Sequence, residues 1–172
     1  SHWRQRGHPV CIVTSDKDLA QLIEANDTWW DFNRNQKLGH AKIKDKFGVF
    51  PGQIADFLAL TGDVVDNIPG VPGIGPKSAA ALLSHFDNLE ALWERIEEVP
   101  HLSIRGAKSL RQKLAEHRPA AELARRLTGI ETRVPSALEN PALARGEVDA
   151  ARLNRLFDEM EFGGMLRRRC LL

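Results

Sequence analysis

The first forty residues alternate between short apolar runs and polar turns. Residues 9–14 are apolar and β-branched, which predicts a short buried strand of the parallel type. An amphipathic pattern over residues 15–23 predicts a helix directly after it. Residues 27–32 predict a second strand, followed by a polar turn or hairpin at 33–39. This order of elements indicates an α/β sheet.

Beyond residue 40 the apolar positions recur with the helical period, and almost no strand is predicted after Gly62. Pro51 stands at the favoured first position of a helix over 52–60, and Gly62 is a natural stop signal for it. The chain therefore divides into an α/β part, 1–50, and a mostly helical part, 51–172. The other predicted helices cover residues 41–47, 77–86, 89–96, 104–117, 120–127 and 149–162, and a loop is predicted at 136–146.

The α/β part lacks some of the elements that such a sheet needs. Residues 3–6, followed by Gly7, have the pattern of a last helical turn with its glycine stop. A parallel strand needs neighbouring strands joined by crossovers, yet only one further good strand follows residues 9–14. We therefore expect the first half of an α/β domain to be missing. Cys11, within the first strand, is expected to be a small core residue.

Composition excludes some classes of protein but does not indicate a function. Of the 172 residues, 42% are hydrophobic and 27% are charged. No stretch approaches the roughly 20 apolar residues that cross a bilayer, so a membrane protein is not expected. Two cysteines at opposite ends and the lack of a leader pattern favour the cytoplasm. The net charge is only +1, but basic residues outnumber acidic ones by five to one at 34–46 and by eight to three at 105–133.

Two acidic pairs are the candidates for catalytic chemistry. Asp16 and Asp18 follow the first strand, where ligands collect in open α/β sheets, and Asp63 and Asp66 lie three residues apart. If the pairs converge, a divalent cation relieves their repulsion, and oxygen ligands without a Cys/His cluster favour Mg²⁺ or Mn²⁺ over zinc. Such ions activate water and neutralise phosphate oxygens. Taken separately, the pairs are explained at least as well by helix capping and by a turn.

The strongest signal is a glycine-rich segment at 68–83 that leads directly into a helix. Its glycines allow tight backbone geometry and close approach of a ligand, and the amides at the start of the helix point toward an anion. Such a segment holds a DNA phosphate without reading bases. The alternative is an ordinary loop in which a proline opens a helix. The candidate DNA-binding residues are Gly73, Ile74, Gly75, Pro76, Lys77 and Ser78.

Four segments of the chain resemble the bacterial 5′-3′ exonuclease and flap endonuclease family, which includes the N-terminal nuclease domain of DNA polymerase I. They read VTSDKDL, KFGVFP, LTGDVVDNIPGV and GIGPKSA. The likeness runs in register from about Val10 to Arg133, and residues 160–172 resemble the closing segment of the family.

The resemblance implies a fold and a set of ligands. The fold is a partial PIN-like, Rossmann-like parallel sheet followed by a mostly helical domain, with a helix-hairpin-helix (helix-3-turn-helix) motif at 68–83. By the resemblance, Asp16, Asp18, Asp63 and Asp66 are the second group of active-site ligands for Mg²⁺ or Mn²⁺. A K⁺ ion is implied at the hairpin. Its ligands are the backbone carbonyl groups of Leu60, Thr61, Pro69, Val71 and Ile74.

The activity implied by the resemblance is that of a structure-specific 5′-nuclease in DNA replication and repair. Its partner is duplex DNA with a 5′ flap or a single-stranded 5′ branch, and a monomer is expected. The family's first strand with its aspartate, the acidic cluster that precedes this region and the helical arch have no counterpart here. The first metal site is thus incomplete, and we expect this chain alone to bind DNA weakly and to cleave poorly or not at all.

Two other interpretations of the sequence stay open. A non-catalytic DNA-binding module would use the hairpin and the basic helices as an anchor. A metal-dependent RNA-cleaving relative with the same α/β core ranks last, because such domains are not expected to carry the GIGPK hairpin. Trp29 and Trp30 are candidates for base stacking, but adjacent strand residues face opposite ways, so at most one is expected to be exposed.

Overall fold

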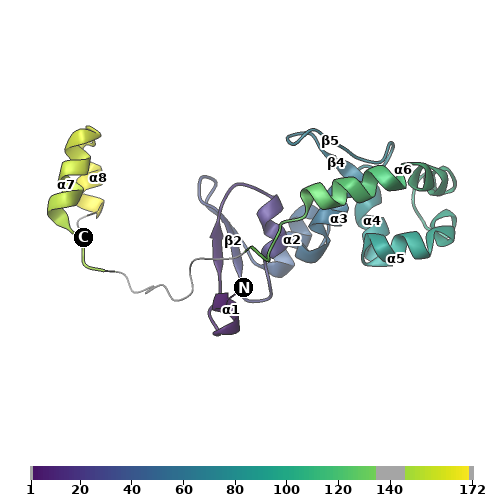
Figure 1. Cartoon of the computed structure of the whole chain (residues 1–172), viewed down its shortest axis with the longest axis horizontal. Coiled ribbons are helices and arrows are strands. Elements are labelled where there is room, and N and C mark those ends of the chain that lie inside the picture. Colours follow the sequence, from purple (N-terminus) through teal and green to yellow (C-terminus); the bar gives the residue numbers. More distant parts are fainter. Residues whose placement is uncertain (1, 135–145, 171–172) are drawn as a thin grey trace. The chain divides into compact units, whose positions relative to one another are not determined.

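The computed structural model describes residues 2–134 and 146–170. Contacts divide the chain into two units, Ser1–Arg133 and Val134–Leu172. Figure 1 shows the first unit as a small sheet with helices packed around and beyond it. The domain boundary predicted at residue 50 falls inside this unit and stays a prediction.

The sheet of the first unit has three strands in the order β1-β2-β3. The strands are β1 (Cys11–Val13), β2 (Thr28–Asp31) and β3 (Gln36–Leu38). As predicted, β1 lies in a parallel arrangement, with β2 as its partner, and the chain turns back after β2, so that β2 and β3 form an antiparallel hairpin with its turn at 32–35. The predicted burial of β1 is wrong, because Cys11 and Val13 are exposed on this edge strand.

Alternation along β2 decides which tryptophan enters the core. Trp29 and Asp31 are buried, whereas Trp30 is half-buried and carries the Lys37 ammonium over its ring, 4.1 Å from the centroid. Neither ring is therefore fully open for base stacking, and the prediction that at most one is exposed holds.

Three short helical elements flank the sheet, namely α1 (His2–Gln5), the 3₁₀ helix η1 (Asp18–Leu22) and α2 (His40–Phe47). The α-helix predicted at 15–23 is wrong in type and length. Asp16 accepts the backbone N–H of Asp18 in a tight turn, and Ile23 already has an extended backbone, so only one 3₁₀ segment fits between them. The predicted last turn before Gly7 is present, with Gly7 at φ +82°.

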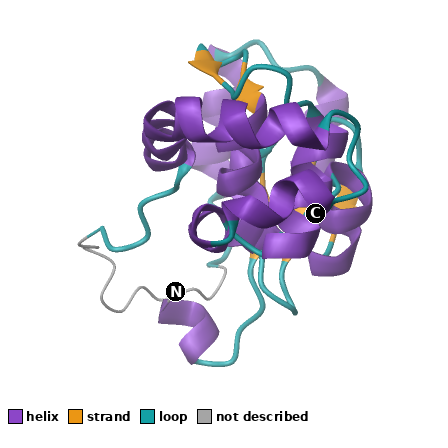
Figure 2. Cartoon of the chain, turned by 90° about the vertical axis from the view of Figure 1, so that its right-hand side faces the viewer, coloured by secondary structure: helices purple, strands orange, loops and turns teal. Residues whose placement is uncertain are grey.

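The helical part begins at Pro51 and contains two short strands that form a hairpin (Figure 2). The hairpin, β4 (Gly62–Asp63) with β5 (Ile68–Pro69), lies between α3 (Ile54–Thr61) and α4 (Pro76–Phe86) in the chain and pairs Gly62 with Pro69 and Asp63 with Ile68. The elements in order are η2 (Pro51–Gln53), α3 (Ile54–Thr61), β4 (Gly62–Asp63), β5 (Ile68–Pro69), α4 (Pro76–Phe86), α5 (Leu89–Glu94), η3 (Ile96–His101) and α6 (Ala107–Thr128).

Helix α6 corrects the sequence prediction of two helices at 104–117 and 120–127. It runs without a break for 22 residues with Pro119 inside it. A proline in a helix interior removes one hydrogen bond, but α6 buries Leu114 before the proline and Ala121 and Ala124 after it. Packing of one continuous apolar stripe therefore outweighs the local cost.

One hydrophobic core joins the sheet to the helices of the first unit. It includes Trp29 from β2, Ile43 from α2, Leu58 from α3, Leu82 from α4 and Leu114 from α6. Because these side chains pack in one cluster, the loops that follow β1 and α3 are fixed relative to each other.

In the second unit the structure describes Val134 and residues 146–170. These residues contain α7 (Ala150–Glu159) and α8 (Gly164–Cys170). Phe157 is buried there, with the Arg167 guanidinium over its ring. The helix predicted at 149–162 is confirmed, whereas the loop predicted at 136–146 lies almost wholly outside the described residues. None of the helices that the structure describes has the length and apolar character to cross a membrane.

Candidate metal centre and backbone hairpin

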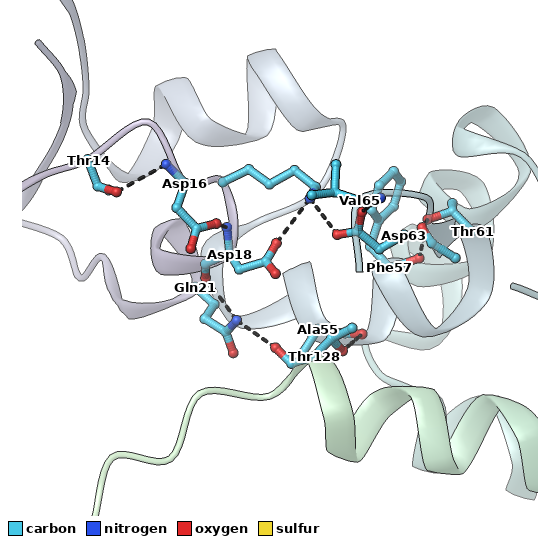
Figure 3. A network of polar contacts seen from close by, with 12 residues as sticks. Thr14, Asp16, Asp18, Gln21, Ala55, Phe57, Thr61, Asp63, Val65 and Thr128 are labelled. Carbon is cyan, nitrogen blue, oxygen red and sulfur yellow. Dashed lines mark hydrogen bonds and ion pairs between the residues drawn. The ribbon is translucent and has the colours of Figure 1, made fainter. Parts of the chain in front are cut away.

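The loop after β1 is a chain of local hydrogen bonds that orients its acidic residues. The Thr14 hydroxyl accepts the Asp16 N–H at 3.0 Å, and Asp16 Oδ1 accepts the Asp18 N–H at 2.9 Å. The Asp16 carbonyl accepts the indole N–H of the buried Trp29 at 3.0 Å. The loop is thereby tied to the core, and Asp18 is turned toward the helical part (Figure 3).

Three of the four predicted carboxylates meet. Oxygen atoms of Asp18, Asp63 and Asp66 lie within 4.8 Å of one another, with Asp18 and Asp63 buried and Asp66 exposed. Asp63 comes from β4 and is held there because Gly62 ends α3 with φ +78°. Asp16 is exposed and lies outside this cluster, and its carboxylate accepts a hydrogen bond from the Asp18 backbone N–H. The convergence of two acidic pairs from distant parts of the chain thus holds for three residues.

Lys17 lies between the carboxylates and was missed by sequence reasoning. Its ammonium is 2.5 Å from Asp63 Oδ2 and 3.3 Å from Asp18 Oδ1. The other Asp63 oxygen accepts the Val65 N–H at 3.0 Å. The signal was present in the sequence, because Lys17 stands between two predicted ligands, but which way its side chain turns depends on the tertiary fold.

The electrostatics of the cluster differ from one carboxyl group to the next. Burial raises the pKa of Asp18, although the Lys17 ammonium opposes this shift. Burial also acts to raise the pKa of Asp63, but hydrogen bonds from Lys17 and from the Val65 N–H outweigh it, and the pKa is lowered. For Lys17 itself, burial acts to lower the pKa, and its contacts with Asp63 and Asp18 raise it overall.

The residues present fit a hard divalent cation. Asp18 Oδ1 is buried and, among the described residues, its polar partner is the Lys17 ammonium at 3.3 Å, so it keeps lone pairs that an ion would use. Two oxygens bound to one Mg²⁺ lie at most about 4.2 Å apart, which the cluster reaches with a small side-chain adjustment. The donors are all carboxylates, the ligand type that Mg²⁺ and Mn²⁺ prefer.

The β4–β5 hairpin is built on two glycines that face each other. A Cβ atom on Gly70 would lie 2.3 Å from the Thr61 carbonyl carbon and 2.4 Å from the Gly62 nitrogen. Just beyond, the Val71 N–H bonds to the Leu60 carbonyl at 2.9 Å. The chain therefore passes the end of α3 at a distance that only glycine allows.

The hairpin brings the five predicted K⁺ ligands into one region. Leu60 and Thr61 end α3, Pro69 pairs with Gly62, and Val71 bonds to Leu60. Ile74 follows, with its N–H on the Val71 carbonyl at 3.0 Å. The carbonyl groups of Leu60 and Val71 each accept one backbone hydrogen bond, which leaves one lone pair on each for another partner.

The predicted phosphate contacts lie where the hairpin leads into α4. Gly73 has φ +86°, and Gly75 precedes the helix with open space where a Cβ atom would lie, since nothing comes within 4 Å. Lys77 is exposed in the first turn. Sequence reasoning missed Lys113 of α6, whose ammonium lies 2.7 Å from the place of a Cβ on Gly73. In the described part of the chain, Lys77 and Lys113 make no salt bridge.

Several other basic residues of the 105–133 stretch are engaged elsewhere. Arg111 pairs with Glu97, and Arg118 with Glu122. Arg125 pairs with the buried Asp56. Part of the positive charge of this stretch is thus neutralised by ion pairs within the protein.

The sheet, the carboxylate cluster and the hairpin define an α/β protein with a candidate divalent-metal centre. A family model described as "5′-3′ exonuclease, C-terminal SAM fold" matches residues 49–151. The chain belongs to this 5′-3′ exonuclease and flap endonuclease family, as the resemblance of its motifs predicted.

Curated relatives carry the same kinds of name. The chain is 45% identical to DNA polymerase I of Pseudomonas aeruginosa over 92% of its length and 17% of that protein's. It is 40% identical to the 5′-3′ exonuclease of Buchnera aphidicola, covering 76% of the chain and 46% of the relative. It is 41% identical to flap endonuclease Xni of Cronobacter sakazakii, covering 73% and 47%. The chain spans less than half the length of each of these relatives.

Solved structures support the fold. The chain is similar to bacteriophage T5 5′-exonuclease, whose structure holds zinc, with a TM-score of 0.58, 22% identity and coverage of 69% of this chain and 42% of that one. A bacteriophage T5 flap endonuclease in a pseudo-enzyme-product complex with DNA and metal ions gives a TM-score of 0.57 at 21% identity, with the same coverage.

Proposed function

We propose that this chain supplies one metal-ligand group and the DNA-binding hairpin of a structure-specific 5′-nuclease, which hydrolyses phosphodiesters in flapped or branched DNA. The observation that carries the proposal is the meeting of Asp18 with Asp63 and Asp66, in a chain whose family is that of 5′-3′ exonucleases. Asp63 and Asp66 belong to the hairpin segment that leads on to residues 73–78, so metal and phosphate sites share one support.

In this proposal Asp18, Asp63 and Asp66 hold Mg²⁺ or Mn²⁺. A bound divalent ion supplies an activated water and neutralises charge on the phosphate oxygens. The side chain of Asp16 acts indirectly, since its hydrogen bond to the Asp18 N–H orients the ligand. This role differs from the direct ligation that the sequence predicted for Asp16.

Residues 73–78 hold a DNA phosphate in this proposal. The first free amides of α4 and the Lys77 ammonium present positive charge, and the open space over Gly75 admits a backbone oxygen. A K⁺ ion held by carbonyl groups at the end of α3 and in the hairpin would bridge the protein to the same phosphate. The grip would be independent of base sequence, which suits an enzyme that selects the shape of its DNA.

The described residues contain a single group of three or more candidate metal ligands. Two-metal phosphodiester hydrolysis needs ions about 3.5–4 Å apart, which three carboxylates alone do not hold well. We therefore propose that the 172-residue chain binds one divalent ion and cleaves poorly or not at all.

Manganese binding tests the metal centre directly. The electron paramagnetic resonance signal of free Mn²⁺ is titrated against the wild-type chain, Asp63→Asn and Asp45→Asn, the last being an exposed carboxylate paired with Lys42. We expect one site in the wild type and in Asp45→Asn, and its loss in Asp63→Asn. Equal binding by all three proteins would refute the assignment of the cluster as the metal centre.

Cleavage of a labelled 5′-flap duplex in Mg²⁺ tests the remaining part of the proposal. Weak or undetectable cutting by the purified chain is expected, and robust cutting would refute the claim that one carboxylate cluster is insufficient. The alternative function, a non-catalytic DNA-binding module, has one observation in its favour: Lys17 already balances part of the cluster's charge without a metal. It predicts DNA binding with no Mn²⁺ site.

A further inference from the structure

The Lys17 ammonium occupies the space between two carboxylates that come from different elements. Asp18 begins η1, whereas Asp63 lies in β4, 46 residues beyond Lys17 in the chain. Lys17 is the only basic residue with a salt bridge to either carboxylate in the described part of the chain. It therefore links the α/β part to the hairpin at the point proposed for the metal.

The contacts of Asp63 leave little room for a second cation. Its Oδ1 is engaged by the Val65 N–H, and its Oδ2 by the Lys17 ammonium at 2.5 Å. A divalent ion bound at about 2.1 Å to Oδ2 would lie within about 5 Å of the ammonium. Two cations that share one carboxylate oxygen repel each other strongly where solvent is partly excluded.

The exposed fractions of the Lys17 and Asp63 side chains indicate which of the two can move. It is 39% exposed, whereas the Asp63 side chain is 3% exposed, so the lysine and not the aspartate is able to move toward solvent. A lysine ammonium is a compact charge on a flexible stem and hydrates readily once it is released.

We propose that Lys17 is a resident counter-cation that competes with the divalent ion for Asp18 and Asp63, so that metal loading requires the ammonium to leave. This inference rests on the proposed metal centre. Lys17 is a positioning residue here, because it holds the cluster together before the ion arrives.

The test compares Lys17→Met with the wild type in two measurements, Mn²⁺ affinity and thermal unfolding with and without Mn²⁺. Methionine keeps an unbranched apolar side chain and removes the charge. We expect Lys17→Met to bind Mn²⁺ at least about tenfold more tightly. It should also unfold at a lower temperature than the wild type without metal and show a larger rise when Mn²⁺ is added.

Lys42→Met is the matched control, because Lys42 makes an exposed ion pair with Asp45 away from the cluster. Its Mn²⁺ affinity should equal that of the wild type. Lys17→Arg keeps a positive charge and should not gain affinity, and Lys17→Gln serves as the neutral variant if the methionine chain does not fold.

The outcomes separate the two proposals. If wild type and Lys17→Met bind Mn²⁺ equally well, or the variant binds it more weakly, the competition is refuted while the metal centre stands. If no Lys17 variant and no wild-type protein binds Mn²⁺ more tightly than Asp63→Asn does, the metal centre fails and the competition fails with it.

Discussion

Replacing Gly70 by alanine should separate the hairpin from the end of α3. The added Cβ would lie 2.3 Å from the Thr61 carbonyl carbon, 2.4 Å from the Gly62 nitrogen and 2.5 Å from the Thr61 oxygen. All three are backbone atoms, so no side chain can rotate away to make room. The segment around Gly70 must move instead.

The magnitude follows from what this movement disturbs. Forcing an extra methyl group into a packed site costs about 1–3 kcal/mol. The bond from the Val71 N–H to the Leu60 carbonyl is next to the clash, and losing a backbone hydrogen bond adds about 1 kcal/mol. We expect Gly70→Ala to lower the free energy of unfolding by about 2–4 kcal/mol.

Gly75→Ala is the matched control, because nothing lies within 4 Å of its Cβ position and its φ of −96° suits any residue. Alanine is a poorer helix cap than glycine, but it also restricts the unfolded chain, and we expect a change within about 1 kcal/mol. Urea unfolding followed by circular dichroism measures both variants, with a midpoint shift of about 1–2 M for Gly70→Ala. Equal stability of the two variants would refute the steric argument.

If DNA approaches the backbone at Gly75, the Gly75→Ala variant should bind DNA more weakly while it stays folded.

Three further predictions concern the core, the acid stability and the metal centre. Leu114→Ala removes a fully buried side chain and should cost about 2–5 kcal/mol in urea unfolding, while the exposed Leu123→Ala should cost less than about 1. Burial acts to raise the pKa of Asp27, but hydrogen bonds from backbone amides and from Arg4 together outweigh it, and the pKa is lowered. The contribution of Asp27 to stability is therefore present above 3.8, its ordinary pKa, and is lost as the pH falls through the lowered value. Asp27→Asn should thus be less stable by about 1.5–3 kcal/mol at neutral pH and approach the wild type in acid; a pH-independent difference would contradict this. Asp16→Ala should weaken Mn²⁺ binding less than Asp63→Asn in the same titration, and an equal loss would mean that Asp16 ligates the ion itself.

Local sequence signals determined most elements of the fold because their causes are local. The parallel strand at Cys11–Val13, the hairpin after β2, the proline start near Pro51 and the stop at Gly62 all follow from side-chain alternation and backbone preference. The family also followed from contiguous motifs, and it is confirmed by the match over residues 49–151.

Two sequence predictions that the structure contradicts have a cause that is not local. Pro119 breaks the helical pattern locally, yet α6 continues because its buried stripe packs on both sides of the proline. Cys11 is apolar and lies in a strand, yet it is exposed because it shares a face of the sheet with Thr28 and Trp30, which are themselves only half-buried. In both cases the deciding contacts lie outside any local window.

The candidate site shows the same division. The sequence by itself determined that carboxylates follow β1 and α3 and that a glycine hairpin precedes α4. Only the tertiary structure decided that Asp18 joins Asp63 and Asp66 while Asp16 stays on the backbone, and that Lys17 lies between the carboxylates. The physical reason is that local preferences set the backbone of each loop, whereas the packing of a shared core sets the distance between loops that are 46 residues apart.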